Sequence, residues 1–525
     1  MEKTCGDKVC SLLSVENILF LMSMALLLLA ADYAQADKRD IRESMVKIYS
    51  VQNSPDYNNP WNMLGPVSVS GSGCIVEGHR ILTNAHVVSD QTFIQVRMHG
   101  QSRKHEAKVV AVSHEADLAL LTVDDNEFFK GVPALKFGSL PEIQQEAVVY
   151  GFPEGGDTLS ITKGVISRTE HIYYAHSLIE LLATQLDAAV NPGNSGGPVM
   201  IDDRIVGVVM GTRMDADNIG YMIPTPIIEH FLTDLEDGDY DGFPDDGIIL
   251  QSMENEGLKK MYGFKEGQTG ALVRAIIPGT PSDGKLFPGD VILSVEGHAV
   301  ADDCTVEFRS NERTSLKYYI QRRHIGDDVK MTILRNGREN KIKLPLTRAW
   351  GNSRLVPMTR HDVAPTYYVY GGLVFCPLTL NYLQANDWRP SNLLNYFVNQ
   401  ILHREGEEVV IISKVLPSNI NNGYQEFVND RIVEVDGREI LNLFELIKIV
   451  EGDPREPFIV FKTESGRIIA LDRELALQDH RNILESYHIA SDRSADLEIA
   501  FENFDMGNGE RAEIQQPDDQ AVSIK

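Results

Sequence analysis

Short apolar runs separated by Gly, Asp, Pro or Ser residues dominate the chain between residues 67 and 150. Hydrophobic and polar positions alternate around them, and the runs fall at residues 73–76, 80–83, 93–96, 108–112, 118–121 and 147–150. Short strands with closely spaced turns are typical of an all-β barrel or sandwich. The pattern therefore predicts a mainly β fold for this part of the chain.

A second pattern occurs twice in the C-terminal half. Residues 287–298 and 428–438 each contain a turn, an Asp, an apolar strand, an acidic residue and a Gly, and a Gly-hydrophobic segment precedes each copy. Such a segment can offer backbone N–H groups to a peptide carboxylate while the strand after it pairs with the peptide. We therefore predict two related peptide-binding modules. Their candidate contact residues are Gly247, Ile248 and Ile249 in the first and Gly372, Leu373 and Val374 in the second. Closed grooves are the alternative, because Asp246 would repel a ligand carboxylate unless it is turned away.

The N-terminus carries an apolar run at residues 18–31, followed by Ala34-Gln35-Ala36. The run is short for a membrane span and the small residues fit a cleavage site, so residues 1–36 are predicted to be a secretory signal peptide. Its flanking charges nearly cancel, which leaves an uncleaved anchor as the alternative. Either case predicts a periplasmic or otherwise extracytoplasmic protein, without a stable membrane span once the signal is removed.

Length and charge narrow the function classes. A chain of 525 residues corresponds to about three or four domains. It has 49 basic and 76 acidic residues, for a net charge of −27. Such a chain repels phosphate backbones and anionic lipids, so neither nucleic acid nor an anionic membrane is an expected partner.

One serine lies in a turn built almost entirely from small or turn-forming residues, at residues 191–198. Gly193 can take a positive φ that turns successive N–H groups toward one point. Gly193, Asn194 and Ser195 are therefore the predicted oxyanion hole, with the backbone N–H groups of Gly193 and Ser195 as its donors. An apolar run at residues 205–210 follows, so the serine precedes a buried strand rather than a helix.

A serine nucleophile needs a histidine base and a carboxylate that orients it. His86 comes just after the apolar run at residues 80–83, and Asp117 opens the run at residues 118–121. A carboxylate at the mouth of a buried strand is partly desolvated and would accept a hydrogen bond from an imidazole. The predicted catalytic residues are His86, Asp117 and Ser195, in this order along the chain.

The blocks around these three residues, at residues 83–88, 117–121 and 191–198, resemble the catalytic blocks of the HtrA/Deg family of trypsin-like serine proteases. The Gly-Gly-Asp loop at residues 155–157 and the arm around Trp61 are most similar to the plant-type branch of Deg proteases. The resemblance implies a mainly β chain, with a trypsin-like double β-barrel protease domain followed by two PDZ-like α/β modules. It also implies unfolded or damaged protein substrates, a homotrimer or a multiple of trimers, and regulation by the PDZ modules.

The expected domains follow from the patterns and the resemblance together. They are a signal peptide at residues 1–36, the protease domain at 37–235, PDZ-like domains at 245–350 and 351–475, and a C-terminal helix with a disordered acidic tail at 476–525. Residues 236–246 are expected to be a solvated acidic linker. Its Asp residues imitate the start of a calcium loop, but the twelfth position is Ile248 instead of the bidentate Glu that such a loop needs.

The expected reaction is ATP-independent peptide-bond hydrolysis through an acyl-enzyme, with no cofactor and no metal. The sequence has neither a complete H-E-x-x-H zinc motif nor a phosphate-binding loop. Ala189, six residues before the serine, stands where a pocket for basic side chains would carry an acid. The substrate pocket is therefore predicted to be apolar, with Met210, Gly211 and Thr212 as candidates for its wall.

The sequence leaves two alternative functions. Residues 193–197 also satisfy the G-x-S-x-G pattern of α/β-hydrolase esterases, but that fold needs a helix after the serine and places its acid and histidine later in the chain. A proteolytically inactive PDZ scaffold or holdase chaperone is the second alternative, and loss of hydrolysis without loss of binding in Ser195→Ala would separate it from a protease.

Overall fold

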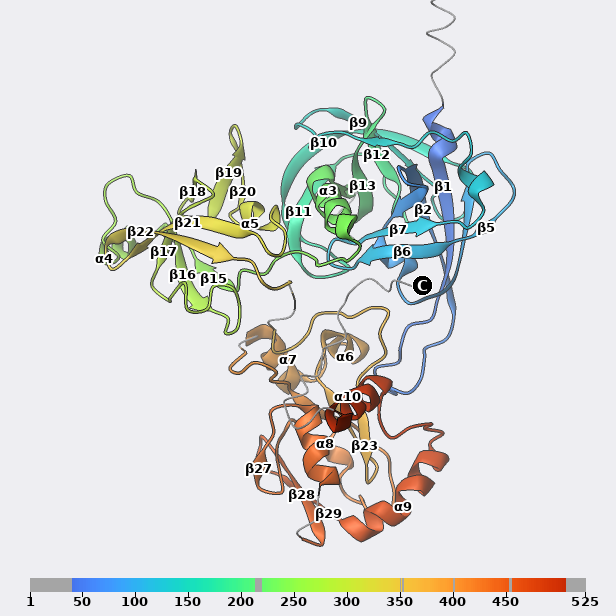
Figure 1. The fold of residues 1–525 in the computed structure, drawn as a ribbon, viewed down its shortest axis with the longest axis vertical. Coiled ribbons are helices and arrows are strands. Elements are labelled where there is room, and N and C mark those ends of the chain that lie inside the picture. Colours follow the sequence, from blue (N-terminus) through green and yellow to red (C-terminus); the bar gives the residue numbers. More distant parts are fainter. Residues whose placement is uncertain are drawn as a thin grey trace, which may run out of the picture.

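The computed structural model describes residues 40–212, 220–349, 351, 354–399, 402–452 and 456–506. The predicted signal peptide and most of the predicted acidic tail lie outside these residues. Figure 1 shows a barrel lobe formed by β1–β14 with α3, a first module formed by β15–β22 beside it, and a second module formed by β23–β29 and α6–α10 below it. In the described part of the chain, no helix has both the length and the apolar character needed to span a membrane.

The barrel lobe begins with an antiparallel sheet of seven strands in the order β5-β4-β1-β2-β3-β7-β6. Its strands are β1 (Met45–Gln52), β2 (Val67–Val76), β3 (Arg80–Thr83), β4 (Gln91–Met98), β5 (His105–Glu106), β6 (Lys108–Ser113) and β7 (Leu118–Thr122). Short helical turns η1 (Ile41–Ser44), α2 (Ala85–Val88) and η2 (Asn126–Phe129) accompany them. Within the described residues the two edge strands do not pair, so this sheet is a half-barrel.

The second sheet closes on itself. Its order is β12-β9-β10-β11-β14-β13-β8, and β12 also pairs with β13, which joins all strands except β8 into a ring. The strands are β8 (Lys136–Phe137), β9 (Glu146–Gly151), β10 (Ser160–Tyr173), β11 (Glu180–Leu186), β12 (Pro198–Ile201), β13 (Arg204–Thr212) and β14 (Gly220–Pro224). The helices α3 (Thr225–Asp234) and η3 (Leu235–Asp237) follow. The expected mainly β, two-barrel architecture is thus confirmed, with one barrel only half closed.

One hydrophobic core runs between the two sheets. It combines Leu118 and Leu120 of β7 with Leu182 of β11, Val208 of β13 and Phe231 of α3, all of which are fully or almost fully buried. Burial of this apolar surface is the main favourable contribution to folding. The turn that carries Ser195 lies against the half-barrel, because the Ser195 carbonyl accepts a hydrogen bond from the Ser72 N–H of β2.

The first module contains the strand path β15-β16-β17-β21-β22, with β18 paired to β17 and a separate hairpin of β19 and β20. Its elements are β15 (Ile248–Gln251), α4 (Glu256–Met261), β16 (Ala271–Ile276), β17 (Val291–Val295), β18 (His298–Ala299), β19 (Thr305–Arg309), β20 (Glu312–Ser315), α5 (Tyr318–Gln321), β21 (Asp328–Arg335) and β22 (Arg338–Pro345). The strand β15 is an edge strand of this sheet.

The second module has two small sheets, β23-β24-β25 and β27-β26-β28-β29. Its elements are β23 (Tyr368–Tyr370), β24 (Leu373–Pro377), α6 (Leu380–Ala385), α7 (Ser391–Asn399), β25 (Val410–Val415), η4 (Gln425–Phe427), β26 (Ile432–Val435), β27 (Arg438–Glu439), α8 (Leu443–Glu451), β28 (Phe458–Thr463), β29 (Ile468–Asp472), α9 (Arg473–Ser486) and α10 (Ala495–Met506). Leu497 of α10 is fully buried in the module's core, so the C-terminal helices pack on the module.

The segment between the barrel lobe and the first module is not a solvated linker along its whole length, in contrast to the prediction. Tyr240 is 4% exposed, Phe243 is fully buried, and Asp245 and Asp246 are each 7% exposed. Glu115 explains this burial, because its carboxylate accepts a hydrogen bond from the Phe243 N–H at 2.7 Å and so holds the segment against the β6–β7 loop.

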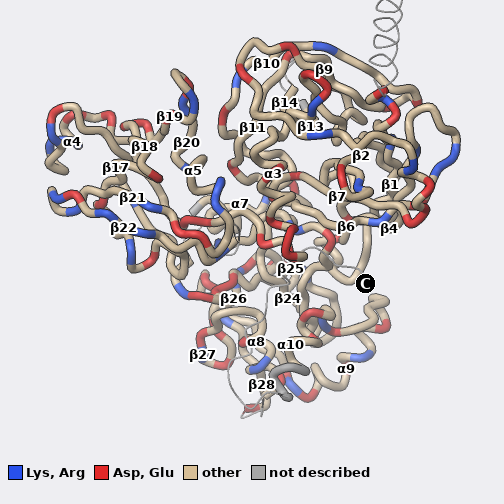
Figure 2. The backbone as a smooth tube through the Cα atoms, turned by 45° about the horizontal axis from the view of Figure 1, so that its top comes forward, with Lys and Arg blue, Asp and Glu red and all other residues tan. Residues whose placement is uncertain are grey.

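The arm around Trp61 lies against the second module, where the Trp61 ring makes an edge contact with Tyr367 at a centroid distance of 5.9 Å. In the described part of the chain, acidic and basic positions are interspersed over all three lobes (Figure 2). The large negative charge is therefore spread over the molecule.

Candidate active site

His86 and Asp117 are brought together by two loops of the half-barrel. Asp117 accepts a hydrogen bond from the His86 backbone N–H at 2.9 Å, and one of its carboxylate oxygens lies 2.8 Å from His86 Nδ1. The side chain of Asn84 donates to the Asp117 carbonyl at 2.8 Å, which holds Asp117 in its left-handed conformation at φ 54°. The Asp117 side chain is only 1% exposed, so its interaction with His86 is weakly screened by solvent.

Burial and the neighbouring carboxylate act on His86 in opposite directions. Burial favours the neutral ring, but the charge of Asp117 and its hydrogen bond together outweigh burial and raise the pKa of His86 above its usual value. Because Asp117 faces Nδ1, the proton of the neutral ring belongs on Nδ1 and the lone pair on Nε2.

Ser195 lies in a turn that backbone hydrogen bonds define. The Asn194 N–H donates to the Asn191 carbonyl at 3.0 Å, and the Ser195 carbonyl accepts from the Ser72 N–H of β2 at 2.8 Å. The Ser195 hydroxyl donates a hydrogen bond to the Met210 carbonyl at 3.4 Å. Among the described residues, it makes no hydrogen bond to His86. Hydrogen bonds of this kind are often absent before substrate binds and form in the reactive complex.

Two glycines are required by the backbone of this turn. Gly193 has φ 92°, and a Cβ added there would lie 2.6 Å from both the Glu154 nitrogen and the Phe152 carbonyl oxygen. Gly196 has φ 84°, and a Cβ there would lie 2.1 Å from the Ser72 carbonyl oxygen. Both the dihedral angle and the lack of space therefore exclude a side chain.

Among the described residues, the backbone amides of Gly193 and Ser195, on either side of Asn194, have no acceptor, and neither has that of Asn191 at the start of the turn. The neighbouring carbonyls point elsewhere, since the Pro192 carbonyl accepts from the Glu154 N–H at 2.8 Å and the Gly193 carbonyl accepts from Ser72 Oγ at 2.7 Å. Asn194 differs, because its N–H is engaged by Asn191. The two amides that flank the Asn194 peptide are thus without an acceptor, which is what a site for an oxyanion requires.

Of the predicted pocket residues, Met210 contacts the serine, because its carbonyl lies 3.4 Å from Ser195 Oγ. Ala189 is exposed and its carbonyl accepts from Thr162 Oγ1 at 3.1 Å, whereas Met210 is half-buried beside Ser195. A Cβ added to Gly211 would meet no atom within 4 Å. Thr212 ends β13, and residues 213–219, which follow it, lie outside the described residues.

In the first module, the predicted carboxylate-binding loop uses its own acids as acceptors. The Gly247 N–H donates to Asp245 Oδ1 at 2.9 Å, and the Ile248 N–H donates to Asp246 Oδ1 at 2.7 Å. Burial raises the pKa of Asp246 to about 6. Ile249 lies on β15, whose second edge is free among the described strands. The strand is thus open to a peptide, but two loop amides are already engaged.

In the second module, the predicted peptide strand is flanked on both sides. Gly371 and Gly372 form the tight turn between β23 and β24, and β24, which contains Leu373 and Val374, pairs with β23 on one edge and with β25 on the other. Leu373 and Val374 are fully buried. Within the described residues, this strand has no free edge for a ligand, because β23 occupies it.

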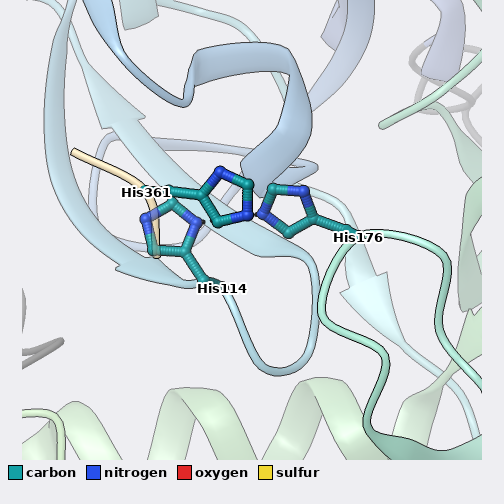
Figure 3. Close-up of side chains that lie close together, drawn as sticks. All are labelled: His114, His176 and His361. Carbon is teal, nitrogen blue, oxygen red and sulfur yellow. Dashed lines mark hydrogen bonds between the residues drawn. The ribbon is translucent and has the colours of Figure 1, made fainter. Parts of the chain in front are cut away.

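Three histidines that sequence reasoning did not group lie close together (Figure 3). They are His114 of the β6–β7 loop, His176 of the β10–β11 loop and His361 of the segment before β23, and one ring nitrogen of each lies within 4.8 Å of the others. Burial lowers the pKa of His361 to about 4, and it also lowers the pKa of His176 well below its usual value, which keeps both rings neutral near neutral pH. No local motif could reveal the cluster, because its members come from three distant segments.

Family models match three parts of the chain. A trypsin-like peptidase domain matches residues 71–208, and PDZ domains match residues 247–346 and 356–496. Among solved structures, the HtrA-type protease AlgW with a decapeptide is 23% identical, covers 60% of this chain and 98% of its own, and has a TM-score of 0.45.

Curated relatives extend over most of the chain. The putative protease Do-like 3 of Arabidopsis thaliana, named as mitochondrial, is 38% identical over 88% of this chain and 81% of its own length. Protease Do-like 2 of the same plant, named as chloroplastic, is 36% identical over 89% of this chain and 77% of its own length. These names do not support the expected periplasmic location. With the arrangement of sheets and modules, the relatives establish that the chain belongs to the HtrA/Deg family of trypsin-like serine proteases with two PDZ domains.

Proposed function

We propose that this protease is an ATP-independent endopeptidase that cleaves unfolded or damaged proteins with Ser195 as nucleophile, His86 as general base and Asp117 as the group that orients the base. The observation that carries the proposal is the double contact of Asp117 with the His86 N–H and Nδ1, together with a serine turn whose Gly193 and Ser195 amides have no acceptor among the described residues. The apolar character of Ala189 and Met210 supports cleavage after small or aliphatic residues.

In the proposed reaction, Asp117 keeps the His86 proton on Nδ1, so Nε2 is free to remove the Ser195 proton. The oxygen then attacks the peptide carbonyl, and the developing oxyanion is held by the Gly193 and Ser195 amides. His86 returns the proton to the leaving amine, and a water molecule hydrolyses the acyl-enzyme in the same way. Removal of one such amide donor typically lowers kcat by a factor on the order of 10²–10³.

A casein degradation assay with wild type and Ser195→Ala tests the proposal. We expect hydrolysis by the wild type only, with Ser195→Ala still binding unfolded casein in a pull-down. Equal hydrolysis by both proteins would contradict the assignment of Ser195. A wild type that binds but never cleaves would favour the scaffold or holdase alternative. The esterase alternative has lost its basis, since β12 and not a helix follows the serine.

We further infer that a regulatory peptide binds along the free edge of β15 in the first module. The corresponding edge of β24 in the second module is already paired with β23. A trimer or a multiple of trimers rests on the family resemblance alone, and light scattering coupled to size-exclusion chromatography tests it.

For location, the names of the relatives support an organelle of the mitochondrial or chloroplast kind over the periplasm. Expression of the full chain with a C-terminal fluorescent tag in plant cells tests this point. Fluorescence confined to the secretory pathway would contradict it.

A further inference from the structure

We propose that His114, His176 and His361 form a binding site for a divalent transition metal ion of the zinc class, which ties the segment before the second module to the barrel lobe. The site is separate from the catalytic residues, although the His176 and His86 rings are 6.2 Å apart between centroids. The proposal does not depend on the proposed reaction, which needs no metal.

The spacing of the nitrogens fits one ion. His114 Nδ1 and His176 Nε2 are 3.0 Å apart. Zinc–nitrogen bonds of about 2.0–2.1 Å in a tetrahedral site place ligand atoms roughly 3.3 Å from each other. One nitrogen of His361 lies within 4.8 Å of the ligand nitrogens of the other two residues. A turn of the His361 ring out of its stack on His176 would direct all three nitrogens at three corners of one tetrahedron.

A carboxylate orients one of the three ligands. His114 Nε2 lies 2.8 Å from Asp362 Oδ2, so its other nitrogen, Nδ1, is the one directed at the cluster. Asp362 is itself fixed, because its N–H donates to Asp90 Oδ1 at 2.8 Å and its carboxylate accepts from the Asp90 N–H. Histidines that bind metals typically give their second N–H to such a carboxylate, which sets the tautomer and the ring orientation.

The third proposed ligand, His361, has a buried ring nitrogen that lacks a hydrogen-bond partner in the described part of the chain. His361 Nε2 is buried and has no hydrogen-bond partner among the described residues. A buried polar atom without a partner costs free energy, and such atoms are uncommon in folded proteins. The His361 ring stacks on His176 at a centroid distance of 3.9 Å and on His114 at 4.7 Å, so it is held between the other two ligands. A metal ion would supply the missing partner.

The two loops that carry His114 and His176 are fixed to each other. Ser177 Oγ donates to the Glu115 carbonyl at 2.9 Å, and the Glu115 carboxylate is held by the Phe243 N–H at 2.7 Å. Two of the three ligands are therefore preorganised on the barrel lobe, and the His361 segment closes the site.

The three imidazole ligands favour transition-metal ions. Three neutral imidazoles suit Zn²⁺, Ni²⁺ or Cu²⁺, whereas Ca²⁺ and Mg²⁺ prefer oxygen ligands. Three protein ligands leave one position for water or a further group. Because the ligands come from both sides of the contact between the barrel lobe and the second module, bound metal would stabilise that contact by mass action.

The test is isothermal titration calorimetry of ZnCl₂ into the full-length Ser195→Ala protein, which avoids self-digestion, after chelator treatment and removal of any histidine tag. We expect one zinc ion per chain, and at least tenfold weaker binding in His176→Ala and His361→Ala. The matched control is His298→Ala, which removes an exposed histidine of the first module that, among the described residues, stacks on Tyr319, and this variant should bind zinc like the parent. Asp362→Asn should weaken binding by about 10- to 100-fold.

A spectroscopic measurement keeps the proposal testable if a histidine variant fails to fold. Co²⁺ added to the folded parent should give the intense visible bands of a four-coordinate site, and equimolar Zn²⁺ should remove them. Absence of these bands, or zinc binding that is unchanged in His176→Ala and His361→Ala, would overturn the proposal. The cluster would then be a network of hydrogen-bonded neutral imidazoles.

Discussion

At the scale of single residues, the site depends on a carboxylate placed where solvent does not reach it. Asp117 has a positive φ and almost no exposure, and its oxygens are occupied by the His86 N–H and ring. The pairing of His86 with Asp117 could be predicted from the sequence because each residue lies in a local pattern that its chemistry requires. The orientation of the Ser195 hydroxyl toward Met210 could not, since a rotamer depends on tertiary contacts.

Asp117→Asn tests the orienting role. The amide keeps the shape but would stabilise the wrong tautomer of His86, so kcat should fall by roughly 10⁴-fold with little change in KM. Steady-state kinetics on a peptide substrate measures this, with circular dichroism as the control for folding. A loss smaller than tenfold in a folded variant would show that the carboxylate does not act through the imidazole.

Gly196→Ala tests the geometry of the serine turn. The added methyl would meet the Ser72 carbonyl oxygen at a left-handed φ, so we expect about 1–3 kcal/mol or more of lost unfolding free energy together with lost activity. Gly155→Ala is the matched control, because its φ is 83° and a Cβ there meets nothing within 4 Å. Equal stability of the two variants in urea unfolding would contradict this account.

At the scale of elements, two strands with the same predicted role differ in their neighbours. Both β15 and β24 follow a Gly-hydrophobic segment, but only β15 has a free edge among the described strands. The sequence could predict the segments because their local pattern repeats. It could not predict that β23 would pair with β24. That pairing depends on the Gly371-Gly372 turn, which reverses the chain so that β24 lies antiparallel to β23.

Asp246→Asn tests the effect of the buried carboxylate that precedes β15 on stability. Burial raises the pKa of Asp246 to about 6, so the folded state holds its proton more tightly than the unfolded state, and stability falls as pH rises from about 4 to 6. The asparagine should therefore raise unfolding free energy by about 1–3 kcal/mol at pH 7.5 and by less at pH 5. Urea unfolding at both pH values measures this, and a gain that grows toward low pH would be the opposite result.

At the scale of the whole molecule, partly buried polar contacts join the barrel lobe to the first module. His171 of β10 lies 2.6 Å from Thr314 Oγ1 and 3.1 Å from Gln321 Oε1, and Gln321 donates to the Glu180 carbonyl. The double-barrel and two-module order could be predicted from motif order and the repeat. The burial of Phe243 and the histidine cluster could not, because their partners are distant in sequence.

Acidic pH should separate the first module from the barrel lobe. Burial lowers the pKa of His171, and it lowers that of His230 to about 4. Stability from these neutral rings is complete above their usual pKa near 6.5 and is lost as pH falls toward 4. Hydrogen exchange should show earlier opening of β20 and α5 at pH 5 than at pH 7.5, after correction for intrinsic rates. His171→Gln should reduce the difference, and unchanged protection at pH 5 would contradict this interpretation.

The most direct test of the central claim is covalent labelling with a fluorophosphonate, read by intact-protein and peptide mass spectrometry. Such probes react with a serine only where a base and an oxyanion site activate it. We expect one adduct per chain, located on Ser195, with labelling greatly slowed in His86→Ala and absent in Ser195→Ala. An adduct on another residue, or labelling at an unchanged rate without His86, would contradict it.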